Sequence, residues 1–464
     1  MSASLQSINS KSVQNSNLSL ASKIIKNSES ETENEGNSEN EGNSENEGNS
    51  ENEGNSENEG NSENEGNSEN EGNKKKKDIR VKDEEIIYEK NITYTLEPKI
   101  TNLEEINDTL KFTISNINVS HVNAIRRVLL SDIPIIGIKT SPYTENKLNI
   151  IVNKTRLNNE LIKQRISSIP IHIDDIDTFP INDYMIEMDK INNSNTIIYA
   201  TTEDFKIKNI NTNKYLLESE VKKIFPPDPI TGDYIDIVRL RPKIVDNINS
   251  EQIKLNATLS ICHAKDDGVF NVVSTCSYGN TLDPLKIKEE WKKKEESFKN
   301  KYSKEEIEFL KKDWLLLDAK RLYIEDSFDF VLETIGIYSN FKLMELAASI
   351  IIKKLYVFLE SLKMNTDLIK EAVDTLENCY IIVIENEDYT IGKIIEYYLF
   401  VNLFLDKKDI NYVGFLKKHP HDINSFIKIS YKLPISKDEI ILNIENAVNA
   451  SILLFNSIKK YFTN

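Results

Sequence analysis

The chain has 464 residues, enough for two or three domains, and a formal net charge of −17. Its three cysteines, Cys262, Cys276 and Cys379, are far apart, which excludes a disulfide framework and a zinc-finger spacing and favours a reducing compartment. The polar N-terminus lacks the apolar core of a signal peptide, and no apolar run approaches the roughly 18 residues of a membrane span. We therefore expect a soluble, intracellular protein that does not contact a membrane.

Charge is distributed unevenly along the chain. Residues 1–73 contain 16 Glu, three Lys and no Asp, so they carry −13 and leave only −4 for the remaining 391 residues. A nearly neutral body has no basic field with which to hold nucleic acid by itself. Any contact with DNA is therefore expected to be indirect.

An acidic hexamer, SENEGN, occurs six times in succession from Ser38 to Asn73. This stretch has no apolar residue with which to build a core, so residues 1–77 are predicted to form a disordered tail. One interpretation of the tail is a solvated spacer. Another is a substrate of acidophilic kinases, because each repeat Ser has acids at +1 and +3. The run Lys74–Lys77 that follows is a candidate nuclear-localisation patch.

Order is predicted to begin near residue 86. Residues 110–117 alternate like a half-buried strand, and a helix follows from Ser120 to about Ser131. From 147 to 245 the pattern predicts short strands, turns and one helix over 160–166.

The middle of the body combines strands with helices of two kinds. Residues 251–278 and 326–337 are predicted to be strands, and the charged stretch 286–312 is predicted to be an exposed helix of unknown purpose. Residues 341–363 form an apolar-rich helix. Residues 361–378 contain no Gly or Pro, which predicts a stiff helical linker.

The last ninety residues have the order strand, helix, strand, strand, helix. The first strand is predicted over 379–388, and Thr390 is a suitable N-cap for the helix after it. The segments INYVGFL and SFIKISYKL are strands, and a final helix runs from about Lys437 to Phe462. This order predicts two amphipathic helices over a small antiparallel sheet.

The helix from Ser120 carries two adjacent arginines among apolar residues. With successive residues about 100° apart, Arg126 falls inside the apolar arc, between Val122 and Leu130. Arg127 falls outside that arc, beside Asn123. We therefore expect different roles for the two arginines.

The segment FTISNINVSHVNAIRRVLLSDIP (112–134) closely resembles the start of the larger alpha-like subunit of eukaryotic and archaeal RNA polymerases and of the bacterial alpha subunit. The likeness is carried by the Asn-x-x-Arg-Arg helix and the Ser-x-x-Pro exit that follows it. Further segments similar to the same subunit occur in order at 157–171, 234–244, 255–279 and 329–337.

The C-terminal unit resembles a different member of the family. IENEDYTIGKIIEYYL and VGFLKKHPHD are similar to the smaller alpha-like subunit, with its Glu-Asp-x-Thr-x-Gly helix start and His-Pro loop. The segment from Ser120 also aligns with the segment from Thr390, although Glu396 and Tyr397 stand in place of the arginine pair. The chain thus looks like both alpha-like subunits fused head to tail, an arrangement that resembles the one in some large DNA viruses.

The resemblance implies an α+β fold in several parts. A larger alpha-like dimerisation domain, with helices on an antiparallel sheet, is expected over 78–140 and 246–375, with 286–312 as an insertion. An inserted β-rich domain is expected over 141–245, and a second, smaller helix-on-sheet domain over 376–464.

The resemblance also implies site residues. The two halves are expected to pair within one monomer, through a seam made of Ile125, Arg126, Leu129, Ile391, Ile394, Ile395 and Leu399. Arg126 is expected to find a hydrogen-bonding partner at that seam. Arg127, facing away from the chain's own core, and Asn123 are expected to contact the second-largest polymerase subunit.

The expected function is that of a non-catalytic assembly subunit of a DNA-directed RNA polymerase, on which the two large catalytic subunits assemble beside small polymerase subunits. The alternative is a free-standing interaction protein that kept the fold outside the enzyme. A viral origin would imply the virion and host cytoplasm, with the nucleus as an alternative location.

Other chemistry has weaker support in the sequence. Cys262 and His263 are adjacent and would point to opposite faces of a strand, which disfavours a nucleophile and base. His419 and His421 flank a proline in a predicted loop, and the Asp174, Asp175 and Asp177 cluster is typical of an exposed acidic loop. Residues 141–245 contain no cysteine, unlike the family's metal-binding insertions, so no metal or other cofactor is expected.

Overall fold

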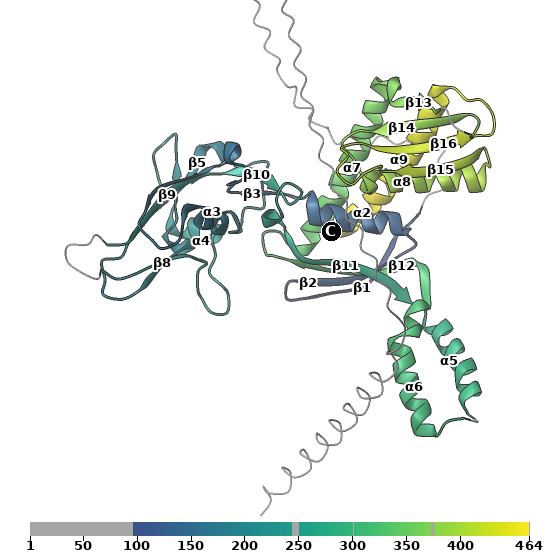
Figure 1. Cartoon of the computed structure of the whole chain (residues 1–464), viewed down its shortest axis with the longest axis horizontal. Helices are drawn as coiled ribbons and strands as arrows, with labels where there is room; N and C mark the ends of the chain where they lie inside the picture. The colour runs from purple at the N-terminus through teal and green to yellow at the C-terminus, as the bar shows by residue number, and fades with distance from the viewer. Residues whose placement is uncertain (1–95, 244–249, 300, 373–374, 464) are drawn as a thin grey trace, which may run out of the picture. The chain divides into compact units, whose positions relative to one another are not determined.

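A computed structural model of the chain describes residues 96–243, 250–299, 301–372 and 375–463 (Figure 1). The predictions for the acidic tail, the lysine run and the start of order near residue 86 lie outside these residues. The described chain combines helices with antiparallel sheets, so the predicted α+β class is confirmed. Within those four ranges, no helix is both long enough and apolar enough to span a membrane.

The first sheet has four antiparallel strands and two helices. Along β2, Leu110, Phe112 and Ile114 alternate with less buried residues and point into the core, as a period of two requires. The strands, in their order across the sheet, are β1 (Lys99–Ile106), β2 (Thr109–Ser115), β12 (Tyr323–Thr334) and β11 (Val273–Leu282), and the helices are α2 (Val119–Ser131) and α7 (Asn340–Met364).

The second sheet also has four antiparallel strands and two main helices. Its first strand was not predicted, because Ile369–Glu371 lies in the stretch expected to be a helical linker. In fact α7 ends at Met364, so the stiff helical linker over 361–378 is wrong. The strands across this sheet are β13 (Ile369–Glu371), β14 (Cys379–Ile384), β16 (Ser425–Tyr431) and β15 (Ile410–Leu416), and the helices are α8 (Tyr389–Leu399), a π-helical extension (Phe400–Asp406) and α9 (Lys437–Thr463).

The two sheets repeat one topology. Each begins with an edge strand and a neighbouring strand, continues through a helix to the opposite edge strand, and then places the fourth strand between the second and the third. In each, a long helix follows the last strand. By this order α2 corresponds to α8, and α7 corresponds to α9.

Both sheets and their helices contribute to one hydrophobic core. Helices α2, α7, α8 and α9 all supply buried residues to it, and α7 packs along α9. Among its largest fully buried side chains are Phe328 and Phe330 from the first sheet, Tyr398 from α8 and Phe455 from α9.

The inserted β-rich region has a core of its own. Its described residues form two antiparallel sheets and two α-helices: β4 (Leu148–Asn153), β9 (Gln252–Thr258), β5 (Tyr184–Ile191) and β7 (Lys206–Asn209) in the first sheet, β6 (Ile198–Thr201) and β8 (Asp236–Leu240) in the second, and α3 (Asn159–Ser167) and α4 (Glu218–Ile224). The larger alpha-like domain was predicted to resume at residue 246. That boundary is wrong, because β9, which follows it in the chain, pairs with β4 and β5 and belongs to the inserted core. The short pair β3 (Pro134–Gly137) and β10 (Ser260–His263) marks where the chain enters and leaves this region.

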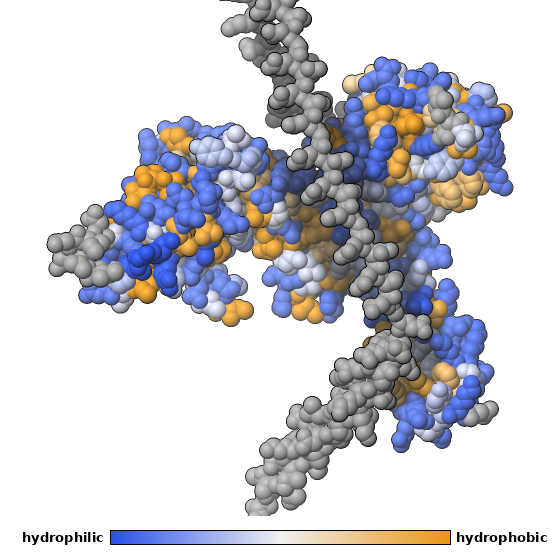
Figure 2. Space-filling model, in the orientation of Figure 1, coloured by the Kyte–Doolittle hydropathy of each residue, from blue (hydrophilic) through white to orange (hydrophobic). Residues whose placement is uncertain are grey.

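The charged stretch 286–312 lies in two helices and not in one. Helices α5 (Pro284–Phe298) and α6 (Lys304–Leu316) form a hairpin around a small core of Trp291, Trp314 and Ala319. The second helix starts at a capping box in which Ser303 and Glu306 each accept the other's backbone N–H. The hairpin is not wholly polar, since apolar surface is visible on it in Figure 2 and Phe309 is 70% exposed.

Candidate functional site

Helices α2 and α8 pack against each other, and we call their contact the pairing seam. The predicted seam residues Ile125 and Leu129 of α2 are buried, as are Ile391, Ile394, Ile395 and Leu399 of α8. All six belong to the shared core. Their spacing of three and four residues places them on one face of each helix. Packing these two apolar faces together removes them from water, which stabilises the seam.

One end of the pairing seam joins Arg127 to the beginning of α8. The Arg127 Nε donates a hydrogen bond of 3.0 Å to Thr390 Oγ1, and its Nη2 forms an ion pair with Asp388. Asp388 is the N-cap of α8, because its Oδ1 accepts from the Thr390 backbone N–H at 2.9 Å. The prediction that Thr390 is the cap is therefore wrong by two residues.

Asp388 is well placed to remain ionised. Burial raises the pKa of this carboxyl, but the Thr390 backbone N–H and the charge of Arg127 lower it further than burial raises it. A carboxylate at a helix N-terminus also interacts favourably with the helix dipole. Asp388 thus serves both as the cap of its own helix and as the counter-ion of the facing one.

The predicted orientation of Arg127, away from the chain's own core, is wrong. Arg127 lies at the edge of the α2 apolar arc that borders α8, where Asp388 and Thr390 supply acceptors. A helical wheel of α2 alone does not include these acceptors, which come from a segment 261 residues later in the chain. Whether Arg127 also contacts another protein remains a prediction.

The predicted partner of Arg126 across the pairing seam is also wrong. Arg126 Nε donates to Asn123 Oδ1 at 3.3 Å, within the same helix, and among the described residues Arg126 makes no hydrogen bond or ion pair with α8. Both side chains are half-buried. Val119, Asn123 and Arg126 follow one another at spacings of four and three residues on the less buried side of α2, and we call this side its outward face.

A second set of charges lies beside the Arg127 contact. Lys354 Nζ of α7 is 2.7 Å from Asp132 Oδ2 at the C-terminus of α2, and 3.1 Å from Glu387 Oε1, one residue before the cap of α8. We call Arg127, Asp132, Lys354, Glu387 and Asp388 the charged junction. It joins α2 and α7 to the start of α8, and no local sequence pattern predicts the Lys354 contacts.

Burial and pairing compete at Lys354 and Glu387. Burial lowers the pKa of Lys354, but Glu387 and Asp132 raise it above its usual value. Burial raises the pKa of Glu387, and Lys354 compensates only in part, so the pKa of this carboxyl stays above its usual value. The Asp132 and Glu387 side chains are 11% and 16% exposed, so neither is well solvated without the lysine.

The opposite end of the pairing seam is aromatic. By the alignment of Ser120 with Thr390, Tyr397 corresponds to Arg127, and its ring lies edge-on to that of His121 with centroids 5.4 Å apart. His121 is fully buried between this ring, Tyr398 and Phe455. Burial lowers the pKa of His121 to about 3, against a smaller rise from the Asn118 carbonyl, so the imidazole is neutral. Sequence analysis missed this histidine, although its spacing of four, seven and eight residues from Ile125, Val128 and Leu129 places it on the apolar face of α2.

The other candidate residues do not assemble into a reactive site. Cys262 is buried, and burial raises the pKa of its thiol to about 11, which disfavours a thiolate nucleophile. His419 and His421 lie in an exposed turn, as do Asp174, Asp175 and Asp177. Across the described ranges, no group of three or more His, Cys, Asp or Glu residues is arranged to hold a metal ion.

Comparison with known proteins agrees with this geometry. A model of the family described as the RNA polymerase Rpb3/Rpb11 dimerisation domain matches residues 111–355, slightly more than half of the chain. This range includes α2 and the first sheet from β2 onward, with the inserted region and the helical hairpin.

Individual relatives match over shorter stretches. Subunit 3B of DNA-directed RNA polymerases IV and V from Arabidopsis thaliana is 36% identical over 80 residues, which are 17% of this chain and 23% of that protein. Subunit rpb3 of RNA polymerase II from Dictyostelium discoideum is 33% identical over 85 residues, 18% of this chain and 26% of that protein. The Rpo3 subunit from Pyrococcus furiosus is 26% identical over 118 residues, 24% of this chain and 42% of that protein. The chain thus covers less than half the length of each of these relatives.

The Asn-x-x-Arg-Arg helix, the antiparallel sheet behind it and the family match over 111–355 lead to one conclusion: this chain belongs to the RNA polymerase Rpb3/Rpb11 dimerisation family and is an alpha-like subunit.

Proposed function

We propose that the chain is a non-catalytic assembly subunit of a DNA-directed RNA polymerase, and that it contains both members of an alpha-like pair. The observation that carries the proposal is the repeated sheet topology, with both copies sharing one core across the pairing seam. In this proposal, residues 96–140 with 259–364 act as the larger alpha-like unit and residues from 369 act as the smaller one.

A covalent link between the two units favours their pairing. Joining two binding modules makes the second contact intramolecular, with an effective concentration of about a millimolar for a short linker. Only Asn365–Leu368 separate α7 from β13, so the second unit starts beside the first. The chain is therefore proposed to be a monomer with an internal pseudo-twofold axis.

The proposed partners are the two large catalytic subunits and small polymerase subunits, with DNA contacted only through the complex. Support comes from the relatives, each of which is named as a subunit of a DNA-directed RNA polymerase. No cofactor is proposed.

The outward face of α2 is the proposed contact for the second-largest subunit. Asn123 and Arg126 pair there, and Val119 on the same side is 46% exposed. Arg127, about a third exposed at the edge of this face, is kept as part of the proposed contact. Because Arg127 also holds α8, its loss would affect both pairing and capture, whereas Asn123 and Arg126 act at the outward face alone.

The experiment is capture of polymerase subunits by the tagged full chain in the cells that express it. Wild type should retain two very large chains, and Asn123→Ala with Arg126→Glu should reduce their recovery without changing the melting temperature. Arg321→Glu, an exposed arginine on the short helix after α6, is the matched control. Capture of other proteins but of no large polymerase chain by the wild type would instead support a free-standing interaction protein.

A further inference from the structure

The inserted region contains a pocket of about 250 Å³ with an unusual lining. Four of its nine lining residues are arginines, namely Arg156, Arg165, Arg239 and Arg241. The chain has 50 Lys but only eight Arg, so half of its arginines meet in this one place. Lysine would supply the same charge, but only arginine presents a planar fork of donors suited to an oxyanion.

A β-bulge helps to build the pocket. Thr201 pairs with Asp236 and Ala200 pairs with Val238, so Ile237 is an extra residue in β8. After the bulge, Val238 and Leu240 point into the core, while Arg239 and Arg241 lie on the opposite, pocket-facing side.

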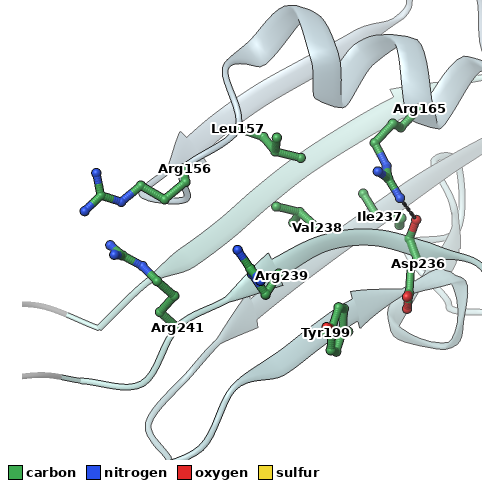
Figure 3. A pocket seen from close by; sticks show the side chains of 9 residues that line it. All are labelled: Arg156, Leu157, Arg165, Tyr199, Asp236, Ile237, Val238, Arg239 and Arg241. Atoms are coloured by element: carbon green, nitrogen blue, oxygen red, sulfur yellow. Dashed lines mark hydrogen bonds between the residues drawn. The ribbon is translucent and has the colours of Figure 1, made fainter.

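The remaining lining comes from neighbouring segments. Tyr199 of β6 lies directly across from Arg239 in the strand pair, Arg156 precedes α3, and Arg165 lies on α3. Figure 3 shows Arg156 and Arg241 reaching toward the same end of the pocket, with Arg239 between them and Tyr199.

Two of the four arginines already have partners. Arg165 Nη2 donates to the backbone carbonyl of Asp236 at 2.7 Å. Arg241 binds Glu251 through its Nε at 2.7 Å, its Nη2 at 2.6 Å and its backbone N–H at 2.7 Å. Burial raises the pKa of Glu251, but these contacts, with a contribution from the charge of Arg156, hold it below its usual value.

Arg156 and Arg239 are different. Among the described residues, neither of these two side chains makes a hydrogen bond or an ion pair, although both line the pocket beside Arg241. Of the carboxylates in the described ranges, only that of Glu251 bonds to this group of three, and Figure 3 shows the Asp236 carboxylate at the other end of the pocket, pointing away from Arg165. The end of the pocket formed by Arg156, Arg239 and Arg241 therefore has two positive charges beyond the one that Glu251 neutralises, and an anion that binds there would reduce the repulsion between them.

We propose that this pocket binds a phosphate monoester. Two free guanidinium groups match the −1.5 to −2 charge of such a group at pH 7, roughly twice that of a carboxylate. The phenol of Tyr199, 49% exposed beside Arg239, is available as a further donor. The monoester can come from a phosphorylated side chain or from a mononucleotide, since both present the same terminal group.

Phosphodiesters of nucleic acid fit the pocket less well. Binding to a strand draws on a track of positive charge along several phosphates, whereas the arginines here converge on one concave site in a body of net charge −4. An isolated, concave set of forks is instead typical of sites that recognise one phosphorylated group.

The test is isothermal titration of the full chain with inorganic phosphate, phosphoserine, adenosine monophosphate, glutamate and a single-stranded oligonucleotide. We expect the three monoester-like ligands to compete for one site, and the tighter of phosphoserine and adenosine monophosphate identifies the source. Arg156→Gln and Arg239→Gln should each weaken binding about tenfold or more. Arg239→Lys should recover only part of the loss, because it keeps the charge but not the fork. Arg321→Gln should bind as wild type does.

Three results would overturn the proposal. One is the absence of phosphate binding to wild type, and another is unchanged binding in the Arg156→Gln, Arg239→Gln double variant with an unaltered melting temperature. The third is tighter binding of glutamate or of the oligonucleotide than of phosphoserine. None of these readouts depends on polymerase subunits, so the proposed function can fail or hold independently.

Discussion

Arg127 and Asp388 form an ion pair between the C-terminal half of α2 and the cap of α8, at one end of the pairing seam. The contact joins the family's arginine pair to the second repeat of the fold. It implies that the second arginine of the pair helps to hold this chain together, whatever else it binds.

Arg127→Ala should lower the free energy of unfolding by about 1–2 kcal/mol, because it removes two charge-assisted hydrogen bonds at a site that is partly exposed. The neighbouring Arg126→Ala is the matched control. It should lower the free energy of unfolding by less than about 0.5 kcal/mol, since the only hydrogen bond of the Arg126 side chain to a described residue is the one to Asn123 in its own helix. Urea unfolding of both variants measures the difference. An Arg126→Ala cost equal to that of Arg127→Ala would contradict the assigned contacts.

Lys354→Met should lower the free energy of unfolding by more than Arg127→Ala does, about 2–4 kcal/mol at pH 8. The larger loss is expected because the substitution leaves Asp132 and Glu387 without their shared counter-ion. Protonating Glu387, whose pKa is already raised, removes one of the two unpaired charges. The cost of the substitution should therefore be smaller at pH 5 than at pH 8, which unfolding at both pH values can measure. Lys353→Met, at the adjacent exposed position, should have little effect at either pH.

His121 should make the fold sensitive to acid. Its pKa of about 3 in the folded chain lies below the unfolded value of 6.5, so between these values the unfolded chain binds more protons and stability falls as the pH falls. Between pH 7.5 and pH 5.5, protonation of His121 in the unfolded chain should lower the free energy of unfolding by about 1.4 kcal/mol. His121→Phe keeps a ring among Tyr397, Tyr398 and Phe455 but cannot take up a proton. Its free energy of unfolding should therefore fall by about 1.4 kcal/mol less than that of wild type over the same pH range. If wild type and variant lose equal stability over this range, His121 does not titrate as its burial implies.

The α5–α6 hairpin should be dispensable for folding of the rest. Leu282 and Tyr323 are strand partners at its base, so a short turn can replace residues 284–321. Its small core of Trp291, Trp314 and Ala319 is separate from the main one. The shortened chain should unfold cooperatively, with a free energy within about 0.5 kcal/mol of wild type. Loss of cooperative unfolding in calorimetry would show that the hairpin supports the shared core.

Apolar periodicity was sufficient to predict most of the elements. The run of Leu110, Phe112 and Ile114 predicted β2, and the spacing of Ile391, Ile394, Ile395 and Leu399 predicted the buried face of α8. These signals are local, so they do not require knowledge of the neighbours of each element. The break between α5 and α6 also had a local signal, the capping box from Ser303 to Glu306, which was not recognised within a strongly charged stretch.

Contacts between distant segments were harder to predict. A helical wheel located Arg127 relative to its own helix but did not reveal Asp388, and it placed Arg126 on an arc whose edge borders solvent. The same limit applies to Lys354 and His121, whose surroundings come from several elements. Strand β13 is only three residues long and has too little pattern to be recognised.

The central claim is that one chain supplies both alpha-like members of a polymerase. Native mass spectrometry of the complex purified through the tagged full chain tests it most directly. We predict one copy of this chain with two very large chains and no separate alpha-like subunit. Recovery of the chain without large polymerase subunits, or of a complex that contains a second copy or a separate alpha-like chain, would contradict the claim.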